Sequence, residues 1–181
     1  MAVRKVGSRE GGREAGRAVR DLALEAAAVE WLRYERQCLL VCLERSPVWG
    51  DYRPDVFGVC RRRQTIEIEC KRTVADFRAD AGKRITSWRK TGALNVRQFY
   101  YIVPPAIADA VRPLLPDYAG LLTLGSTDAT FTRLPRVEVE HGAPVNRAAK
   151  RLTVLEMARM AKHQTATLHR LLTYIVKGER T

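Results

Sequence analysis

The sequence predicts a single α/β domain. A helical pattern comes first, strand-like runs and short helices follow, and a long helical pattern ends the chain, which is the order expected of a sheet covered by helices. The length of 181 residues suits one domain with a buried core. Hydrophobic residues make up 46% of the chain, which excludes a wholly disordered protein. No apolar run approaches the ~20 residues that a membrane-spanning helix needs, so we expect no membrane association.

The N-terminal part of the sequence predicts a basic arm, a helix and a strand. Residues 1–20 mix basic residues with glycines and are followed by no apolar core, which predicts a flexible basic arm and not a secretory signal. The domain itself is expected to span residues 21–181. From Asp21 to about Cys38, apolar residues recur at helical spacing, and the apolar run Leu39–Leu43 is typical of a strand.

The central part predicts a β-hairpin followed by a helix. Two strand-like runs, Arg53–Cys60 and Gln64–Lys71, are joined by Arg61–Arg63. Thr73 then lies three residues before Asp76, a spacing that resembles a capping box and predicts the start of a helix. Residues 81–97 are basic and irregular.

The C-terminal part predicts further strands and helices. In chain order these are a strand at Gln98–Val103, a short helix at Ile107–Leu115, a strand pair formed by Gly120–Leu124 and Ala129–Thr132, a strand at Val137–Glu140, and a long helix from Asn146 to about Val176.

Charge and cysteine content narrow the class of protein. Lysine and arginine number 32 and aspartate and glutamate 20, so the formal net charge is +12. Such an excess favours a polyanionic partner, nucleic acid first, although it also serves solubility alone. None of the four cysteines forms a C-x-x-C pair, so we expect reduced, mostly buried thiols in a cytoplasmic protein: Cys38, Cys42, Cys60 and Cys70.

The hairpin brings acidic and basic side chains together. Alternation along the second strand places Glu67, Glu69 and Lys71 on one face. If the loop is Arg61–Arg63, Asp55 lies opposite Glu69, with Cβ atoms roughly 4.5–5.5 Å apart. Like charges at this distance repel unless a cation lies between them, and carboxylate oxygens suit Mg²⁺, with Mn²⁺ as a substitute. A loop of another length would turn Asp55 to the other face.

The lysine completes a set of groups that suits phosphodiester hydrolysis. Lys71 lies two residues beyond Glu69, about 6.6 Å along the strand. An ammonium group there can stabilise negative charge on a phosphate, and a metal-bound water supplies hydroxide near neutral pH. The simpler interpretation is a solvated strand face, because the tripeptide E-x-K is common.

These residues resemble a known motif. Pro54-Asp55 and Glu69-Cys70-Lys71, spaced as two hairpin strands, resemble the PD-(D/E)xK nuclease superfamily. The longer stretches Arg53–Val56 and Ile68–Asp80 are similar to the MmcB-type DNA-repair branch, and so are Phe99–Pro104 and Ala119–Leu122, so the resemblance covers roughly residues 20–175. The residues after Asp80 depart from the basic-aromatic continuation of that branch. The resemblance implies a restriction-endonuclease-like core, with a central mixed β-sheet flanked by helices and a long C-terminal helix.

The resemblance also implies an activity. It predicts a Mg²⁺-dependent deoxyribonuclease, an endonuclease of DNA repair or processing, with Asp55, Glu69 and Lys71 as catalytic residues. Asp55 and Glu69 would bind the metal with a further acid, for which Glu25 is preferred and Glu67 is an alternative; Glu30 and Glu44 are rivals of Glu25. Many nucleases that cut both strands are dimers, so a homodimer is one form to consider. A non-catalytic nucleic-acid-binding module on the same fold is the main alternative, and a basic interaction protein the third.

Residues near the motif are candidates for contacts with nucleic acid. They are basic or aromatic: Arg61, Arg62, Arg63, Arg72, Lys83, Arg84, Trp88, Arg89 and Lys90. Trp88 fits core packing equally well. Asp80 has two interpretations: it stabilises its helix, or it orients Lys71 and nearby basic side chains.

Overall fold

A computed structural model describes residues 23–44, 52–83, 86, 89–91, 95–125 and 136–178, with side chains up to position 166 and at 168 and 169. The predicted basic arm, residues 1–20, lies outside the described residues. So does the predicted strand at Ala129–Thr132.

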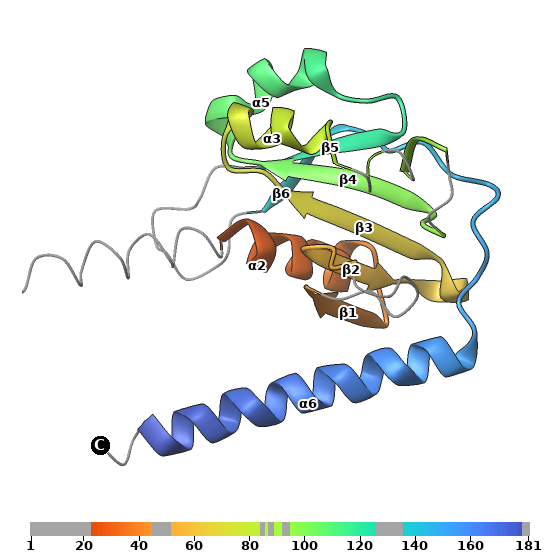
Figure 1. Ribbon diagram of the computed structural model, residues 1–181, viewed down its shortest axis with the longest axis vertical. Coiled ribbons are helices and arrows are strands. Elements are labelled where there is room, and N and C mark those ends of the chain that lie inside the picture. The colour runs from red at the N-terminus through yellow and green to blue at the C-terminus, as the bar shows by residue number, and fades with distance from the viewer. Residues whose placement is uncertain are drawn as a thin grey trace, which may run out of the picture.

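A six-stranded mixed sheet forms the centre of the molecule, with its strands in the order of the sequence (Figure 1). The strands are β1 (Leu40–Leu43), β2 (Val56–Val59), β3 (Thr65–Cys70), β4 (Gln98–Val103), β5 (Ala119–Leu124) and β6 (Val137–His141). The pairs β1–β2 and β2–β3 are antiparallel, the pairs β3–β4 and β4–β5 are parallel, and β6 is antiparallel to β5. The predicted central mixed sheet flanked by helices is confirmed.

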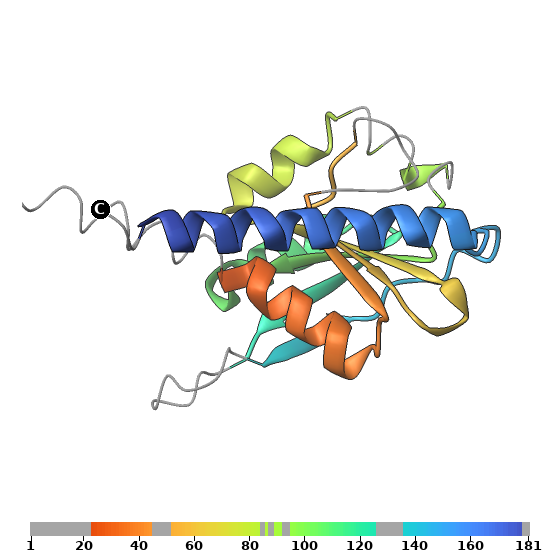
Figure 2. The same ribbon diagram turned by 90° about the horizontal axis from the view of Figure 1, so that it is seen from below.

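Helices cover both faces of the sheet. The first helix, α2 (Ala23–Glu30), continues into a π-helical turn at Trp31–Glu35 and packs on one face. On the other face lie α3 (Val74–Asp80) and α5 (Pro105–Val111), which connect the parallel strands (Figure 2). This arrangement follows from the sequence, since parallel neighbours need a crossover connection.

The core has two layers, one on each side of the sheet. Beneath α2, the layer includes Leu24, Leu32, Ile68 and Tyr100. On the α3 side it consists mainly of aromatic and branched residues, among them Phe57, Phe77, Phe99, Tyr101 and Leu121. Alternate residues of β3 therefore face different layers, and the acidic residues of β3 lie on the α3 side.

The C-terminal helix begins later than predicted. α6 spans Val154–Gly178 and lies along the edge strand β1 (Figure 1), whereas the sequence pattern predicted a start at Asn146. The preceding residues instead attach to strand ends: the Asn146 N–H donates to Arg97 O at 2.9 Å and the Leu152 N–H to Arg63 O at 3.1 Å. Thr153 and Glu156 then form the capping box that starts the helix. Val154, the first residue of the helix, is 73% exposed.

One pair of cysteines differs from the prediction of four reduced thiols. The structure joins Cys38 and Cys60 in a disulfide. Cys38 precedes β1 and Cys60 follows β2, and because these strands are antiparallel the two residues lie at the same end of the pair. Cys42 and Cys70 are free and buried, and burial raises the pKa of Cys42 to about 11.

Within the described residues, the helices are too short or too polar to span a bilayer.

Candidate active site

The predicted hairpin register is confirmed. Val56 lies opposite Ile68 and Phe57 opposite Glu67, and the Cys60 N–H donates to Gln64 O at 2.8 Å. The same register, continued by one pair, places Asp55 beside Glu69 at the start of β2 and the end of β3.

Asp55 lies in a confined, acidic environment. Its Oδ2 accepts a hydrogen bond from the Cys70 N–H at 2.8 Å, which fixes the carboxylate against the end of β3. Burial and the neighbouring charge of Glu69 raise the pKa of Asp55 to about 6, and Glu25 adds to the effect. The repulsion between opposed carboxylates that the sequence predicted is therefore present.

Lys71 bridges two carboxylates. Its Nζ lies 3.4 Å from Glu69 Oε2 and 3.0 Å from Asp80 Oδ1, and all three side chains are buried. Burial alone would lower the pKa of Lys71, but the charges of Glu69 and Asp80 outweigh it and raise the pKa. Lys71 is accordingly a charged ammonium held next to Glu69.

Asp80 gathers four donors at the end of α3. Besides Lys71, these are Arg89 at 3.1 Å, the Tyr101 hydroxyl at 2.8 Å and Lys83 at 2.8 Å. Burial would raise the pKa of Asp80, but these hydrogen bonds and charges lower it to about 2. The contact with Lys71 is the one that the orienting interpretation of Asp80 requires.

Glu67 and Arg89 form a buried ion pair beside this cluster. Glu67 has no exposed surface, and its Oε1 accepts from Arg89 Nη2 at 2.6 Å and from Arg89 Nε at 3.0 Å. The same Nη2 lies 2.8 Å from Glu69 Oε1. Burial opposes the charge on Arg89, but the charges of Glu67 and Glu69 raise the pKa of the guanidinium. Tyr52 donates to Glu67 at 2.5 Å and also lies within hydrogen-bond distance of Glu69.

The further acids predicted from the sequence occupy different places. Glu25, on α2, pairs with Arg72 at 2.5 Å. Glu44 is exposed, and its N–H donates to Asp55 O at 3.0 Å, so its backbone adjoins the site. Glu30 is half-buried at the end of α2, and no described contact joins it to the site.

The donor atoms suit a hard divalent cation. Among the described residues, no three histidine, cysteine, aspartate or glutamate side chains are arranged to hold a metal ion. Asp55, Glu69 and Glu25 nevertheless offer carboxylate oxygens, and Glu25 Oε2 is buried without a hydrogen-bond partner. Because the charges of Glu69 and Glu25 raise the pKa of Asp55, a cation between these groups would offset a repulsion that already exists. The chemistry of these donors, and not an arrangement already in place, is what suits Mg²⁺ or Mn²⁺.

The residues predicted to contact nucleic acid do not form one surface. Arg61–Arg63 lie at the hairpin tip, at the opposite end of β3 from Glu69. Arg89 is 7% exposed and directed to the acids, which differs from the surface role suggested by the sequence. The remaining candidates are the paired Arg72 and Lys83, the exposed Lys90, and Arg84 and Trp88, which lie outside the described residues.

Sequence reasoning missed two groups of the site, Tyr52 and Tyr101. Tyr52 precedes the strand pattern, and Tyr101 reads as an ordinary core residue of β4. Their hydroxyls contact Glu67 and Asp80 only because distant segments meet in the fold. Its position three residues before Asp55 is a signal that could have indicated Tyr52.

Comparison with known proteins supports the fold. No protein-family model matches the chain, and no curated protein matches it. The structure is similar to a solved protein of unknown function from Silicibacter pomeroyi, with a TM-score of 0.56 and 23% sequence identity. The likeness covers 86% of this chain and 90% of the other. At this identity it concerns the fold alone.

Proposed function

We propose that this protein is a metal-dependent endonuclease that hydrolyses phosphodiester bonds in DNA. The observation that carries the proposal is the convergence of Asp55, Glu69 and Lys71 at one end of the β2–β3 pair. The net charge of +12 favours a polyanionic substrate. The resemblance to DNA-repair nucleases supports a role in DNA repair, and a cytoplasmic location belongs to the same proposal.

Each residue has a chemical task in this proposal. Asp55 and Glu69, with Glu25, would hold Mg²⁺, which supplies a water of lowered pKa and offsets charge on the phosphate. Lys71 keeps its proton because Glu69 and Asp80 stabilise the ammonium. It can therefore stabilise negative charge on the phosphate. Asp80 and Arg89 fix the positions of Lys71 and Glu69.

Cleavage assays on the full chain test this proposal. We expect cleavage of plasmid or linear DNA in Mg²⁺ or Mn²⁺, reduced roughly 100-fold or more in D55N and in K71M. E138Q, which alters an exposed glutamate of β6, is the matched control and should cleave normally. Cleavage that survives both D55N and K71M would show that the catalytic assignment is wrong.

A non-catalytic nucleic-acid-binding module is the second candidate. Arg89 contacts both Glu67 and Glu69, and Lys71 contacts Glu69, so the chain's own cations already compensate these acids. This candidate predicts salt-dependent DNA binding without cleavage. It also predicts that Mg²⁺ does not raise the melting temperature, whereas a metal-binding site would.

A further inference from the structure

A polar pocket lies at the opposite end of the sheet from Glu69. It has a volume of about 300 Å³ and forms where the first helix ends, the hairpin turns and β4 begins. Its lining includes four arginines and three glutamines: Arg36, Arg61, Arg62, Arg97, Gln37, Gln64 and Gln98. From Gln64 to Cys70 the strand advances about 20 Å, which separates this pocket from the candidate active site.

No carboxylate among the described residues neutralises the positive charge of the pocket. In the part of the chain that the structure describes, none of the four arginines has a carboxylate within ion-pair distance, whereas Arg112 has two. Arg36 instead donates to Gln98 Oε1 at 2.6 Å, and Arg97 donates to Asn146 O at 3.1 Å. These neutral contacts hold the guanidinium groups of Arg36 and Arg97 in place and leave their charge available to an anion.

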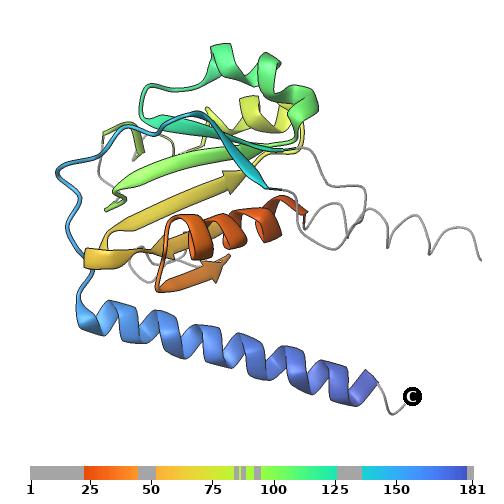
Figure 3. The same cartoon turned by 180° about the vertical axis from the view of Figure 1, so that it is seen from behind.

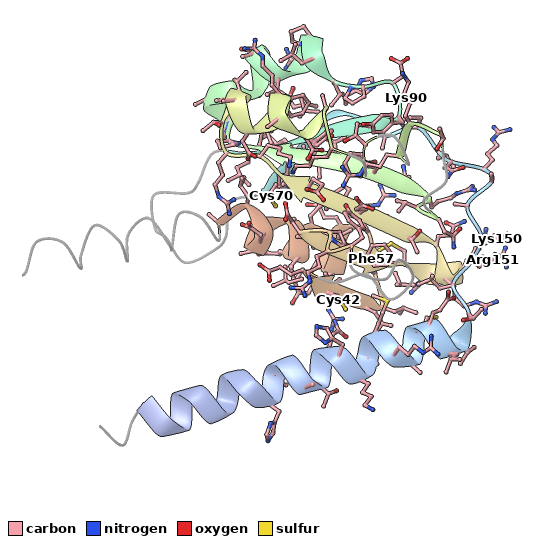
Figure 4. All side chains as sticks on the ribbon, viewed as in Figure 1. Cys42, Phe57, Cys70, Lys90, Lys150 and Arg151 are labelled. Carbon is pink, nitrogen blue, oxygen red and sulfur yellow. A yellow bond between two sulfur atoms is a disulfide. The ribbon has the colours of Figure 1, made fainter. Side chains whose placement is uncertain are left out.

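The basic surface continues beyond the pocket. The segment before α6 passes the hairpin tip, where the Leu152 N–H donates to Arg63 O at 3.1 Å (Figure 3). This contact brings the exposed Lys150 and Arg151 next to the tip, and the exposed Arg147 follows Asn146, whose N–H donates to Arg97 O beside the pocket. Figure 4 shows Lys150 and Arg151 at one end of the sheet and Cys70 at the other. The basic surface therefore extends beyond the pocket and is long enough to contact more than one anionic group.

Three non-glycine residues in or beside the pocket have a positive φ. Arg62 has a φ of 64°, Arg63 of 60° and Gln37, beside Arg36, of 51°. This left-handed conformation favours glycine, because a Cβ atom meets the neighbouring carbonyl. Long basic side chains at Arg62 and Arg63 bring the fold no packing, since both are exposed. Strain of this kind collects at functional sites.

We propose that this pocket binds a backbone phosphate of nucleic acid and anchors the polymer about 20 Å from the candidate active site. Guanidinium groups match phosphate oxygens through paired hydrogen bonds. The adjoining basic residues would contact further phosphates of the same polymer, and the glutamine amides can bond to sugars or bases. The choice of nucleic acid over other polyanions rests on the proposed function.

Binding measured by fluorescence anisotropy with labelled DNA in EDTA tests the proposal. The variant R61Q/R62G removes two charges, and glycine suits the left-handed backbone of position 62, so the fold should be kept. We expect at least a tenfold loss of affinity at 0.1 M salt, and a slope of log K against log salt that is shallower by about two. Unfolding curves verify that the variant is folded.

The matched control is R159Q/K162Q, which removes two charges from exposed positions of α6. Its loss of DNA affinity and its change in the slope of log K against log salt should both be less than half of those of R61Q/R62G. Equal losses in the two variants, or none in R61Q/R62G, would overturn the proposal. The proposal would also be overturned if the parent protein bound poly-glutamate or phosphatidylserine vesicles as tightly as DNA and R61Q/R62G lost that binding. These affinities are measured in EDTA, where metal-dependent cleavage does not occur, so failure of the nuclease proposal would leave this result intact.

Discussion

Arg89 is the residue on which the acids of the candidate site depend. Its side chain reaches Glu67, Glu69 and Asp80 and lies 4.1 Å over the ring of Phe99. Glu67 has no contact with solvent, so its charge has to be compensated within the protein. A basic residue that appears in the sequence as one of many surface cations is thus an internal counter-ion.

We predict that R89M destabilises the protein by about 3–5 kcal/mol, because it leaves Glu67 and Glu69 without their buried cation. Urea unfolding measures the change. The double variant E67Q/R89M should recover part of the loss, since the most buried charge is then removed as well. A stability of R89M equal to that of the parent protein would show that the pair contributes nothing.

The lowered pKa of Asp80 predicts how the free energy of unfolding depends on pH. Its pKa of about 2 in the folded protein lies below the ordinary 3.8. Its contribution is therefore fully present above pH ~4 and is lost as the pH falls towards 2. We expect the parent protein to lose about 2 kcal/mol more than D80N across that interval. Parallel stability curves for the two proteins, measured by denaturant unfolding at each pH, would contradict this.

At the scale of elements, the N-cap of α3 links stability to the site. Thr73 Oγ1 accepts from the Asp76 N–H at 3.0 Å, and the same helix carries Asp80 in its last turn. T73A should destabilise the protein by about 1 kcal/mol and lower any DNA cleavage, because Asp80 orients Lys71. T153A, which removes the cap of α6, should cost similar stability and leave cleavage unchanged. Equal cleavage by T73A and T153A would show that α3 does not position the residues of the candidate site.

Elements fixed by local pattern could be predicted from the sequence. β4 was predicted with its observed bounds, and a three-residue hairpin loop determined which residue lies opposite Glu69. The start of α6 could not be predicted, since residues 146–152 are held by strand ends that are distant in sequence. The role of Arg89 could not be predicted for the same reason, because its acidic partners lie in other segments and no periodic pattern shows which acids the fold brings to it.

At the scale of the whole molecule, opposite charges are separated along the sheet. The acids collect where β3 ends, and the uncompensated arginines collect where β3 begins. A long polyanion on this surface would be attracted to one end and would meet carboxylates, with or without a cation, at the other. The distance between the arginine pocket and the acidic site therefore sets the shortest ligand that can contact both.

That length is testable with DNA. About 20 Å along β3 corresponds to roughly six base-pair steps of 3.4 Å, so hairpin-closed stems shorter than this should contact one end of the surface at a time. In Mg²⁺, on the background of K71M, which should not cleave, we expect affinity to rise steeply as the stem lengthens through about six pairs and gently thereafter, because a cation at the acidic end then attracts phosphate as the pocket does. On the same background R61Q/R62G should abolish the steep rise, because the pocket no longer attracts phosphate, while R159Q/K162Q should retain it. The same rise in all three proteins would mean that the pocket and the acidic site do not act on one ligand.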